Sequence, residues 1–339
     1  MQINFRKIKI LLLLYAVSIG LFAQHKEPED FGFSHHTIQF NDDIIDILIQ
    51  TKTGEENKTK PALLFCQGSL PIPLIKTAGN TIYGVFPFDT DSLLKDYHLV
   101  IISKPYIPVI IEAEKLAENF LYIDSTTGKV PSAYTKRNYL DYYVYRNIAV
   151  VDYLQTLPFI STKKLIVAGH SQGCTIAAKM ATLSKKITHL IIASGNPFGQ
   201  ITSMLREYRR AEKPGDSTNY GDELLNYWES VVANKDNNDD VYGDTYKSIY
   251  DFSTPAINYL LKIKIPTFVC YGSKDINAPY NDYLRIETIR QQKENFTFKA
   301  YLGREHNFFS VKEKGEINYN DFGWNKVADD WKSWLLKNR

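Results

Sequence analysis

Residues 165–178 read Leu-Ile-Val-Ala-Gly-His-Ser-Gln-Gly-Cys-Thr-Ile-Ala-Ala, and this stretch decides the fold class. It begins with a short run of apolar residues, as expected for a buried strand. A five-residue turn bounded by Gly169 and Gly173 follows, and after it comes a segment rich in small residues that is typical of a tightly packed helix. A strand that passes through a short turn directly into a helix is a building unit of α/β proteins.

The turn has the pattern Gly-x-Ser-x-Gly, with Ser171 at its tip. A serine in so sharp a turn has strained backbone geometry, and the two glycines remove side chains that would collide with the neighbouring strand and helix. The following N–H and the helix N-terminus face any negative charge that develops at the serine. The pattern therefore predicts a nucleophile. The alternative is a turn that binds phosphate, but no further glycines or Lys follow as a P-loop needs.

Apolar runs and helix-length segments alternate along the rest of the chain. An antiparallel hairpin is expected over 36–50. Further strands are expected at 62–66, 99–103, 165–168, 190–193, 267–271 and 296–302. Helices are expected at 139–157, 172–183, 280–292 and 324–336. This alternation predicts an α/β fold, one domain over 36–339 with a doubly wound, mostly parallel sheet of about eight strands.

Two stretches, 105–137 and 196–261, are too long to be simple connections. Long insertions in compact domains are usually functional lids or disordered segments. Apolar spacing at 201–205 and 224–228 favours short helices in the second insertion. That insertion precedes the strand at 267–271, so both its ends lie at the carboxyl edge of the sheet, where ligands enter such folds. We therefore expect 196–261 to be a helical lid that selects the substrate.

With this nucleophile turn, the chain resembles the α/β-hydrolase family, and the resemblance covers nearly all residues after 35. In that family the acid follows a later strand and the histidine follows the last strand, in the chain order Ser, acid, His. Residues 271–279, Tyr-Gly-Ser-Lys-Asp-Ile-Asn-Ala-Pro, look like the acid loop. Residues 303–308, Gly-Arg-Glu-His-Asn-Phe, look like the histidine loop. The resemblance implies Asp275 as the acid and His306 as the base.

The chemistry of the residues agrees with this assignment. A neutral serine is a poor nucleophile, so it needs a base within hydrogen-bond reach, and the base needs a partner that sets its tautomer. Of seven histidines, only His306 lies in a loop at the carboxyl end of a late strand; a solvated surface residue is the alternative. Glu305 competes with Asp275 as the acid, but its adjacency to His306 makes the required side-chain geometry unfavourable.

The resemblance also implies an oxyanion hole. One N–H should come from Gln172, and the other from the loop after the strand at 62–66, which reads Gln-Gly-Ser-Leu-Pro over 67–71. Ser69 is the expected donor in that loop. The family often has His-Gly where this chain has Gln67 and Gly68, and Gln67 either braces the loop by hydrogen bonding or is solvated.

Composition limits the partners and cofactors. The chain has 40 Lys plus Arg and 38 Asp plus Glu, and this net charge of +2 is too even to indicate a general attraction to nucleic acid or anionic membranes. Cys66, Cys174 and Cys270 lie in or beside apolar runs without metal-ligand spacing, and we interpret them as buried, unpaired thiols. No metal or other cofactor is expected. The expected partner is a small-molecule ester or peptide substrate.

Residues 1–23 have the layout of a cleavable secretory signal, with basic residues within 6–9, an apolar run over 10–22, and Ala23 before a polar stretch. An uncleaved membrane anchor is the alternative, but the run is shorter than the roughly 18 apolar residues of a spanning helix. We expect export, to the periplasm or to the outside of the cell, and no stable membrane span after cleavage.

These features together predict a metal-independent serine hydrolase that works through an acyl-enzyme intermediate. In this hypothesis Ser171 attacks a carbonyl, His306 takes and returns the proton, and Asp275 orients His306. Carboxylic esters are the expected substrates. A peptidase or amidase of the same fold is one alternative, since the same residues serve both reactions. The other is a non-catalytic binding protein that retains the fold.

Overall fold

The structure is a computed structural model that describes residues 26–79, 81–215, 217–241 and 244–338. The expected signal sequence at 1–23 lies outside the described residues. Within the described ranges, every helix is too short or too polar to cross a membrane.

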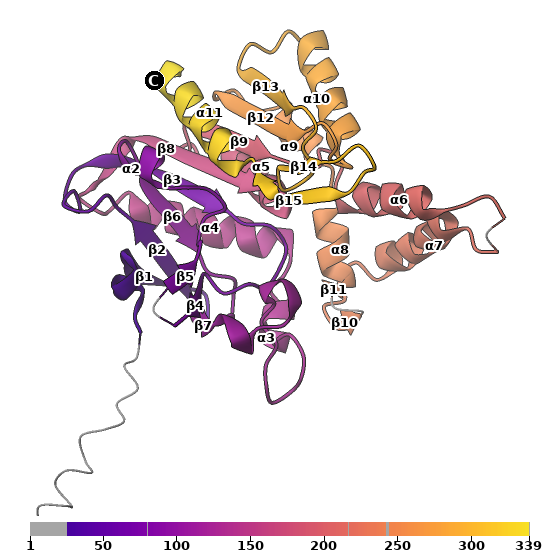
Figure 1. Cartoon of the computed structure of the whole chain (residues 1–339), viewed down its shortest axis with the longest axis horizontal. Coiled ribbons are helices and arrows are strands. Elements are labelled where there is room, and N and C mark those ends of the chain that lie inside the picture. Colours follow the sequence, from indigo (N-terminus) through magenta and orange to yellow (C-terminus); the bar gives the residue numbers. More distant parts are fainter. Residues whose placement is uncertain (1–25, 80, 216, 242–243, 339) are drawn as a thin grey trace, which may run out of the picture.

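An eight-stranded sheet forms the centre of the molecule (Figure 1). In order across the sheet, its strands are β1 (Phe33–Phe40), β2 (Asp43–Gln50), β6 (His98–Ile102), β3 (Lys60–Cys66), β8 (Ile160–His170), β9 (His189–Ala193), β12 (Thr267–Gly272) and β13 (Phe296–Tyr301). β2 pairs antiparallel with both of its neighbours, and every pairing from β6 to β13 is parallel. The predicted α/β class, with a mostly parallel sheet of eight strands, is confirmed.

Both faces of the sheet are covered, and β8 shows how. Leu165 and Val167 point into one apolar core, Ile166 and Ala168 into the other, and all four are fully buried. Helices α4 (Leu140–Leu154), α5 (Gln172–Leu183) and α10 (Ala278–Arg290) contribute to the first core. Helices α2 (Asp91–Leu94) and α11 (Trp324–Lys337) contribute to the second. Consecutive apolar residues in a strand therefore do reflect cover on both faces.

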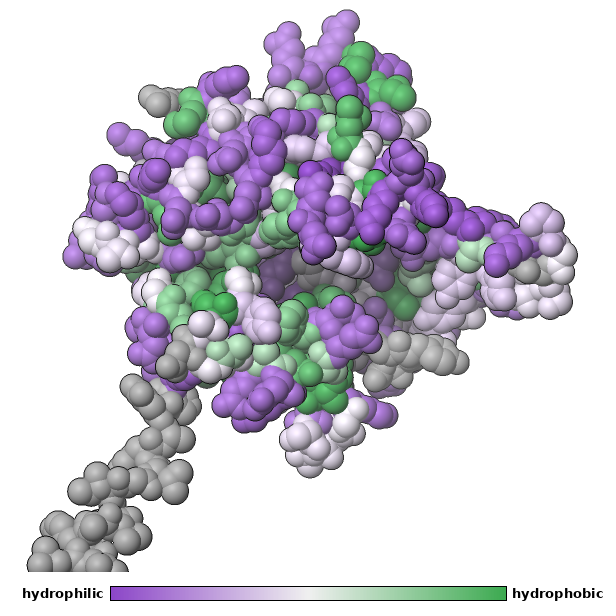
Figure 2. Space-filling view, in the orientation of Figure 1, coloured by the Kyte–Doolittle hydropathy of each residue, from purple (hydrophilic) through white to green (hydrophobic). Residues whose placement is uncertain are grey.

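The expected lid segment, 196–261, consists of two parts. Helices α6 (Gln200–Ala211) and α7 (Tyr220–Ala233) form a hairpin that projects from the body of the molecule (Figure 1). Helices α8 (Tyr246–Phe252) and α9 (Ile257–Leu260) instead belong to the body, because Phe252 and Leu260 are buried in the core that contains α4 and α5. Figure 2 shows the surface hollowed beside the base of the projecting hairpin.

The remaining elements are short and lie around the sheet. A three-stranded sheet has the order β5 (Thr81–Tyr83), β4 (Ile75–Ala78), β7 (Ile110–Glu112). Two antiparallel pairs are β10 (Asp240–Val241) with β11 (Asp244–Thr245), and β14 (Phe309–Val311) with β15 (Ile317–Phe322). The short helices are η1 (Pro28–Phe31), η2 (Ala113–Lys115), η3 (Glu118–Phe120) and α3 (Ser132–Thr135). The first long insertion, 105–137, thus contains β7, η2, η3 and α3.

Candidate active site

Ser171 occupies a strained turn between β8 and α5. Its backbone has φ 54° and ψ −124°, a conformation that residues with side chains rarely adopt. A Cβ on Gly173 would lie 2.1 Å from the Cys66 carbonyl oxygen, and a Cβ on Gly169 would lie 2.4 Å from the Gly173 carbonyl oxygen. A side chain at either position would clash with a backbone carbonyl oxygen, so both positions require glycine, as the sequence pattern indicates. The turn leaves the Ser171 side chain facing a cavity.

The imidazole of His306 lies between Ser171 and Asp275. Its Nε2 is 2.9 Å from the Ser171 Oγ, and its Nδ1 is 3.0 Å from the Asp275 Oδ2. An ionised carboxylate only accepts hydrogen bonds, so Nδ1 donates to Asp275 and Nε2 is left to accept from the Ser171 hydroxyl. Burial disfavours the imidazolium, but the hydrogen bond and charge of Asp275 outweigh it and raise the pKa of His306. The ring is therefore a stronger base toward the serine.

Backbone contacts bring the acid loop against the histidine loop. The Lys274 N–H donates to the Arg304 carbonyl oxygen at 2.8 Å, and a Cβ on Gly272 would lie 2.2 Å from that oxygen. Asp275 is also held within its own loop, since its Oδ1 accepts a hydrogen bond from the Asn277 N–H at 2.9 Å. Its side chain is fully buried. One oxygen of the carboxylate therefore accepts a hydrogen bond from its own loop, and the other accepts one from His306.

Glu305 has a different role from Asp275. Its Oε1 accepts hydrogen bonds from the N–H groups of Asn307 at 2.8 Å and Phe309 at 3.0 Å, so it shapes the turn that carries His306.

His170 also contacts the turn that carries His306, with its Nε2 3.3 Å from the His306 carbonyl oxygen. Burial, and next the neighbouring charge of His306, lower the pKa of His170 to about 3, so it stays neutral.

The two expected oxyanion donors lie near Ser171. Gln172 is the first residue of α5, where the N–H groups of a helix have no intrahelical partner. Ser69 lies in the loop after β3, and that loop passes close to the nucleophile, because a Cβ on Gly68 would lie 3.6 Å from the Ser171 Cβ. Gln67 donates from its Nε2 to the carbonyl oxygen at the end of β6, at 2.8 Å. Of its two interpretations, Gln67 therefore braces the loop.

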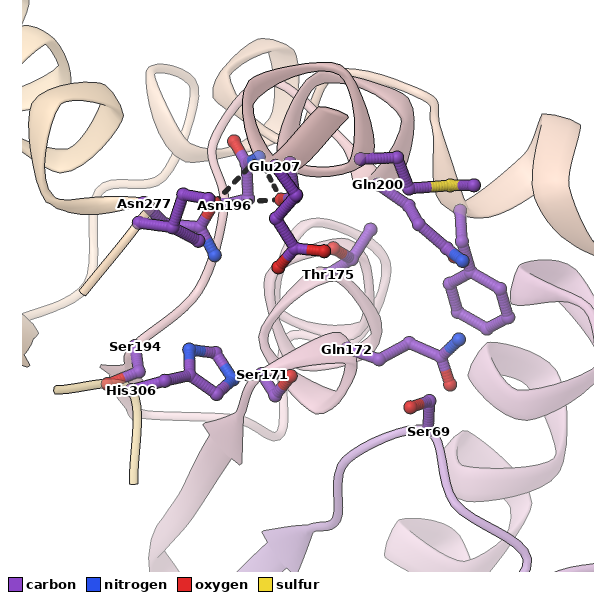
Figure 3. A pocket seen from close by; sticks show the side chains of 14 residues that line it. Ser69, Ser171, Gln172, Thr175, Ser194, Asn196, Gln200, Glu207, Asn277 and His306 are labelled. Carbon is purple, nitrogen blue, oxygen red and sulfur yellow. Dashed lines mark hydrogen bonds between the residues drawn. The ribbon is translucent and has the colours of Figure 1, made fainter. Parts of the chain in front are cut away.

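A cavity of about 420 Å³ opens in front of Ser171 (Figure 3). Most of the residues that line it are of polar types, and they include residues of the nucleophile turn, of α6 and of the acid loop. Figure 3 shows Glu207 of α6 reaching down toward Thr175, on the same side as Ser171. Among the described residues that line the cavity, Glu207 is the only carboxylate, and none is Lys or Arg.

Sequence reasoning missed several polar residues of this cavity. Ser194 follows β9, has φ 54°, and its buried Oγ has no partner within the described chain. The Asn196 Nδ2 donates to the Ser203 Oγ at 2.6 Å and to the Asn277 Oδ1 at 3.2 Å, which ties α6 to the acid loop. Their position could have identified Ser194 and Asn196, because both follow a predicted strand and the residues after parallel strands meet at one edge of the sheet.

The cysteines take no visible part in this site. Cys66, Cys174 and Cys270 are all buried and unpaired, as interpreted from the sequence. Burial raises the pKa of the Cys66 and Cys270 thiols to about 12, so they stay protonated at neutral pH. Across the described parts of the chain, no three His, Cys, Asp or Glu side chains are grouped so that they could hold a metal ion.

Solved structures share this fold at low sequence identity. Est1E from Butyrivibrio proteoclasticus matches with a TM-score of 0.53 and 16% identity, over 90% of this chain and 98% of that chain. DcsB matches with a TM-score of 0.51 and 13% identity, over 90% of this chain and 99% of that one. Porphyromonas gingivalis dipeptidyl peptidase 4 matches with a TM-score of 0.51 and 14% identity, over 91% of this chain but only 35% of the peptidase. No curated protein matches the chain in sequence.

The fold and the nucleophile turn define the class of protein: it is a serine hydrolase of the α/β-hydrolase fold. The sequence pattern of the prolyl oligopeptidase family matches residues 134–324, more than half of the chain. The chain belongs to this family. The matched region contains Ser171, Asp275 and His306, whereas Ser69 lies before it.

Proposed function

We propose that the protein hydrolyses carboxylic esters through an acyl-enzyme intermediate on Ser171. The observation that carries this proposal is the pair of contacts that joins the Ser171 Oγ to His306 and His306 to the buried Asp275. A hydroxyl, a base and a charged partner in this order are what nucleophilic acyl transfer requires. The cavity in front of Ser171 is within the size range of small-ligand sites.

The geometry supports the following sequence of steps. The Ser171 Oγ bonds to the substrate carbonyl carbon while its proton passes to the His306 Nε2, and Asp275 stabilises the imidazolium. The N–H groups of Gln172 and Ser69 donate to the tetrahedral oxyanion. The intermediate collapses as the leaving alcohol takes the proton from His306. Water then attacks the acyl-enzyme by the same route, which releases the carboxylic acid and restores the Ser171 hydroxyl.

Amides and peptides are the second candidate substrates, and the family match favours them. The two candidates differ in the leaving group alone, so matched substrates separate them. A 4-nitrophenyl ester and a 4-nitroanilide with the same acyl group should be compared by kcat/KM. A preference for the anilide beyond the difference in intrinsic reactivity would identify a peptidase or amidase.

Labelling with a fluorophosphonate tests the proposed nucleophile. One equivalent should bind covalently, at Ser171, and the Ser171→Ala variant should take up none. On a cognate ester, Ser171→Ala should lose at least about 10⁴-fold in kcat while it stays folded, since only binding and the oxyanion hole then remain. Residual activity within about tenfold of wild type would refute the mechanism. Absence of labelling in a folded wild-type protein would favour the non-catalytic binding protein.

Export remains part of the proposal and rests on the layout of residues 1–23. Expression of the full chain in a Gram-negative host, followed by N-terminal sequencing of the periplasmic and secreted fractions, tests it. A mature N-terminus at or near Gln24 supports export with cleavage. An intact Met1 in the membrane fraction would instead indicate an uncleaved anchor.

A further inference from the structure

Side chains from outside hold the loop that carries Ser69. Beyond the bond from Gln67, the Lys104 Nζ donates to the Gly68 carbonyl oxygen at 2.6 Å, and the Tyr134 hydroxyl donates to the Ser69 carbonyl oxygen at 3.0 Å. Each of these bonds restrains one peptide group. The orientation of the loop backbone beside the nucleophile therefore depends on residues distant in the sequence.

Lys104 is the only charged member of this set, and it is buried. It is 4% exposed, and its ammonium lies 4.9 Å from the centre of the Tyr143 ring. Within the described residues, it forms no ion pair with a carboxylate. Burial of a charge without an ion-pair partner costs stability, so this lysine is poorly explained as a stabilising residue. Its hydrogen bond is instead directed at the Gly68 carbonyl, in the loop next to Ser171.

Peptide geometry links that hydrogen bond to the oxyanion hole. The Gly68 C=O and the Ser69 N–H belong to the same planar peptide group, and this peptide is trans, so the two bonds point in opposite directions. Lys104 is buried and does not line the cavity, whereas Ser69 lines it together with Ser171. With its carbonyl held toward Lys104, the peptide directs the Ser69 N–H toward the cavity. That N–H donates to no other group within the described chain.

We propose that Lys104 is a positioning residue for the reaction, whose ammonium holds the Gly68 carbonyl and thereby keeps the Ser69 N–H directed at the oxyanion. The inference rests on the proposed function, because it assigns Lys104 to the oxyanion hole of that mechanism. Lys104 does not line the cavity in front of Ser171. It acts through the peptide, and its positive charge polarises the same peptide so that the N–H becomes a better donor.

The titration of Lys104 supplies a distinctive signature. Burial, and next the positive charge of Arg146, lower the pKa of Lys104 to about 7, whereas Cys66 and Asp244 act in the opposite direction. The Tyr143 phenol remains protonated, because burial raises its pKa. The ammonium is thus present below about pH 7 and is lost as the pH rises. Since His306 must be neutral to act as the base, its raised pKa sets the acid limb of kcat, and Lys104 sets the alkaline limb.

The test compares two buried lysines. Lys104→Met keeps an apolar stem of similar length and removes the ammonium. Lys76→Met is the matched control, since Lys76 is also buried and donates to backbone carbonyls, those of Pro73, Leu74 and Gly84, but does not line the cavity. On one 4-nitrophenyl ester, kcat and KM are measured from pH 5 to 10 for wild type and both variants.

Lys104→Met should lose about 10- to 100-fold in kcat, less than the roughly 100- to 1,000-fold cost of removing an oxyanion donor outright. KM should change by less than about twofold, because the oxyanion exists only beyond the ground state. The alkaline limb should disappear. Lys76→Met should keep the kcat and the pH profile of wild type, even if it is less stable.

A second variant keeps the test decisive if Lys104→Met does not fold. Lys104→Arg retains a charge that does not titrate below pH 12, so its alkaline limb should move out of the measured range. An alkaline limb at the wild-type position in Lys104→Arg overturns the proposal, and so does a folded Lys104→Met with kcat within about twofold of wild type. Full activity in Ser171→Ala would refute the proposed function instead. Turnover that needs Ser171 but not Lys104 refutes only this inference.

Discussion

Replacement of Asp275 by Asn should reverse the hydrogen bonding of His306. In the native protein, the Asp275 Oδ1 accepts from the Asn277 N–H and the Oδ2 accepts from the His306 Nδ1. An Asn at this position keeps its oxygen toward the Asn277 N–H, which places the amide NH₂ against His306. The NH₂ group donates, so Nδ1 must accept and the ring proton moves to Nε2. A protonated Nε2 in a neutral ring cannot take the proton of Ser171.

The size of the effect follows from these contacts. Recovery of the active tautomer requires the amide to flip, which leaves a buried N–H without its acceptor at a cost of about 1–3 kcal/mol. Loss of the carboxylate also removes its attraction to the imidazolium, about 4 kcal/mol for unit charges 4 Å apart near a protein surface. The His306 side chain is 30% exposed, so solvent weakens this attraction. Together the terms give about 4–5 kcal/mol, a loss of roughly 10³- to 10⁴-fold in kcat.

The assay is kcat on a 4-nitrophenyl ester across the pH range, with Glu305→Gln as the matched control. The amide oxygen of Gln can still accept from the backbone N–H groups that Glu305 holds, so this variant should lose about tenfold or less. The acid limb of Asp275→Asn should also move to lower pH, because burial lowers the pKa of His306 and the variant loses the two largest opposing effects, the hydrogen bond and the charge of Asp275.

The reverse ranking of the two variants would show that the acid is Glu305. Retention of activity within about tenfold in Asp275→Asn, at the pH optimum of wild type, would refute the tautomer argument. Circular dichroism of both variants separates either result from unfolding.

Two further predictions concern the projecting hairpin. In the first, a Gly/Ser linker replaces residues 200–233, and α8 and α9 are retained because they are part of the core. This variant should show changed relative kcat/KM among substrates of different acyl chain length, while fluorophosphonate still labels Ser171. Unchanged selectivity would contradict the lid assignment. Glu207→Gln should move the acid limb of kcat/KM to lower pH, since the charge of Glu207 helps to raise the pKa of His306. The control Glu223→Gln, exposed on α7, should leave the limb in place.

Much of the fold is predictable from local patterns. The buried strands are short runs of consecutive apolar residues, as in 165–168, because cover on both faces leaves no position that must be polar. The nucleophile turn is equally local, since Gly169 and Gly173 are required within a few residues of Ser171. In contrast, local patterns do not show where the projecting hairpin ends. α8 and α9 belong to the body because their apolar side chains meet α4 and α5, which lie far away in the sequence.

By itself, the sequence determines the order of strands and helices and the strained turn at Ser171, because each depends on neighbours in the chain. Its resemblance to the α/β-hydrolase family indicates the two loops that carry Asp275 and His306. Only the tertiary structure decides which carboxylate meets the imidazole and what holds the oxyanion loop. The Gly68 carbonyl and Lys104 are 36 residues apart, and they come within 2.6 Å because the loops after β3 and β6 leave the same edge of the sheet. Hydrogen bonds of this kind depend on how separate strand ends are juxtaposed, and no local pattern encodes that.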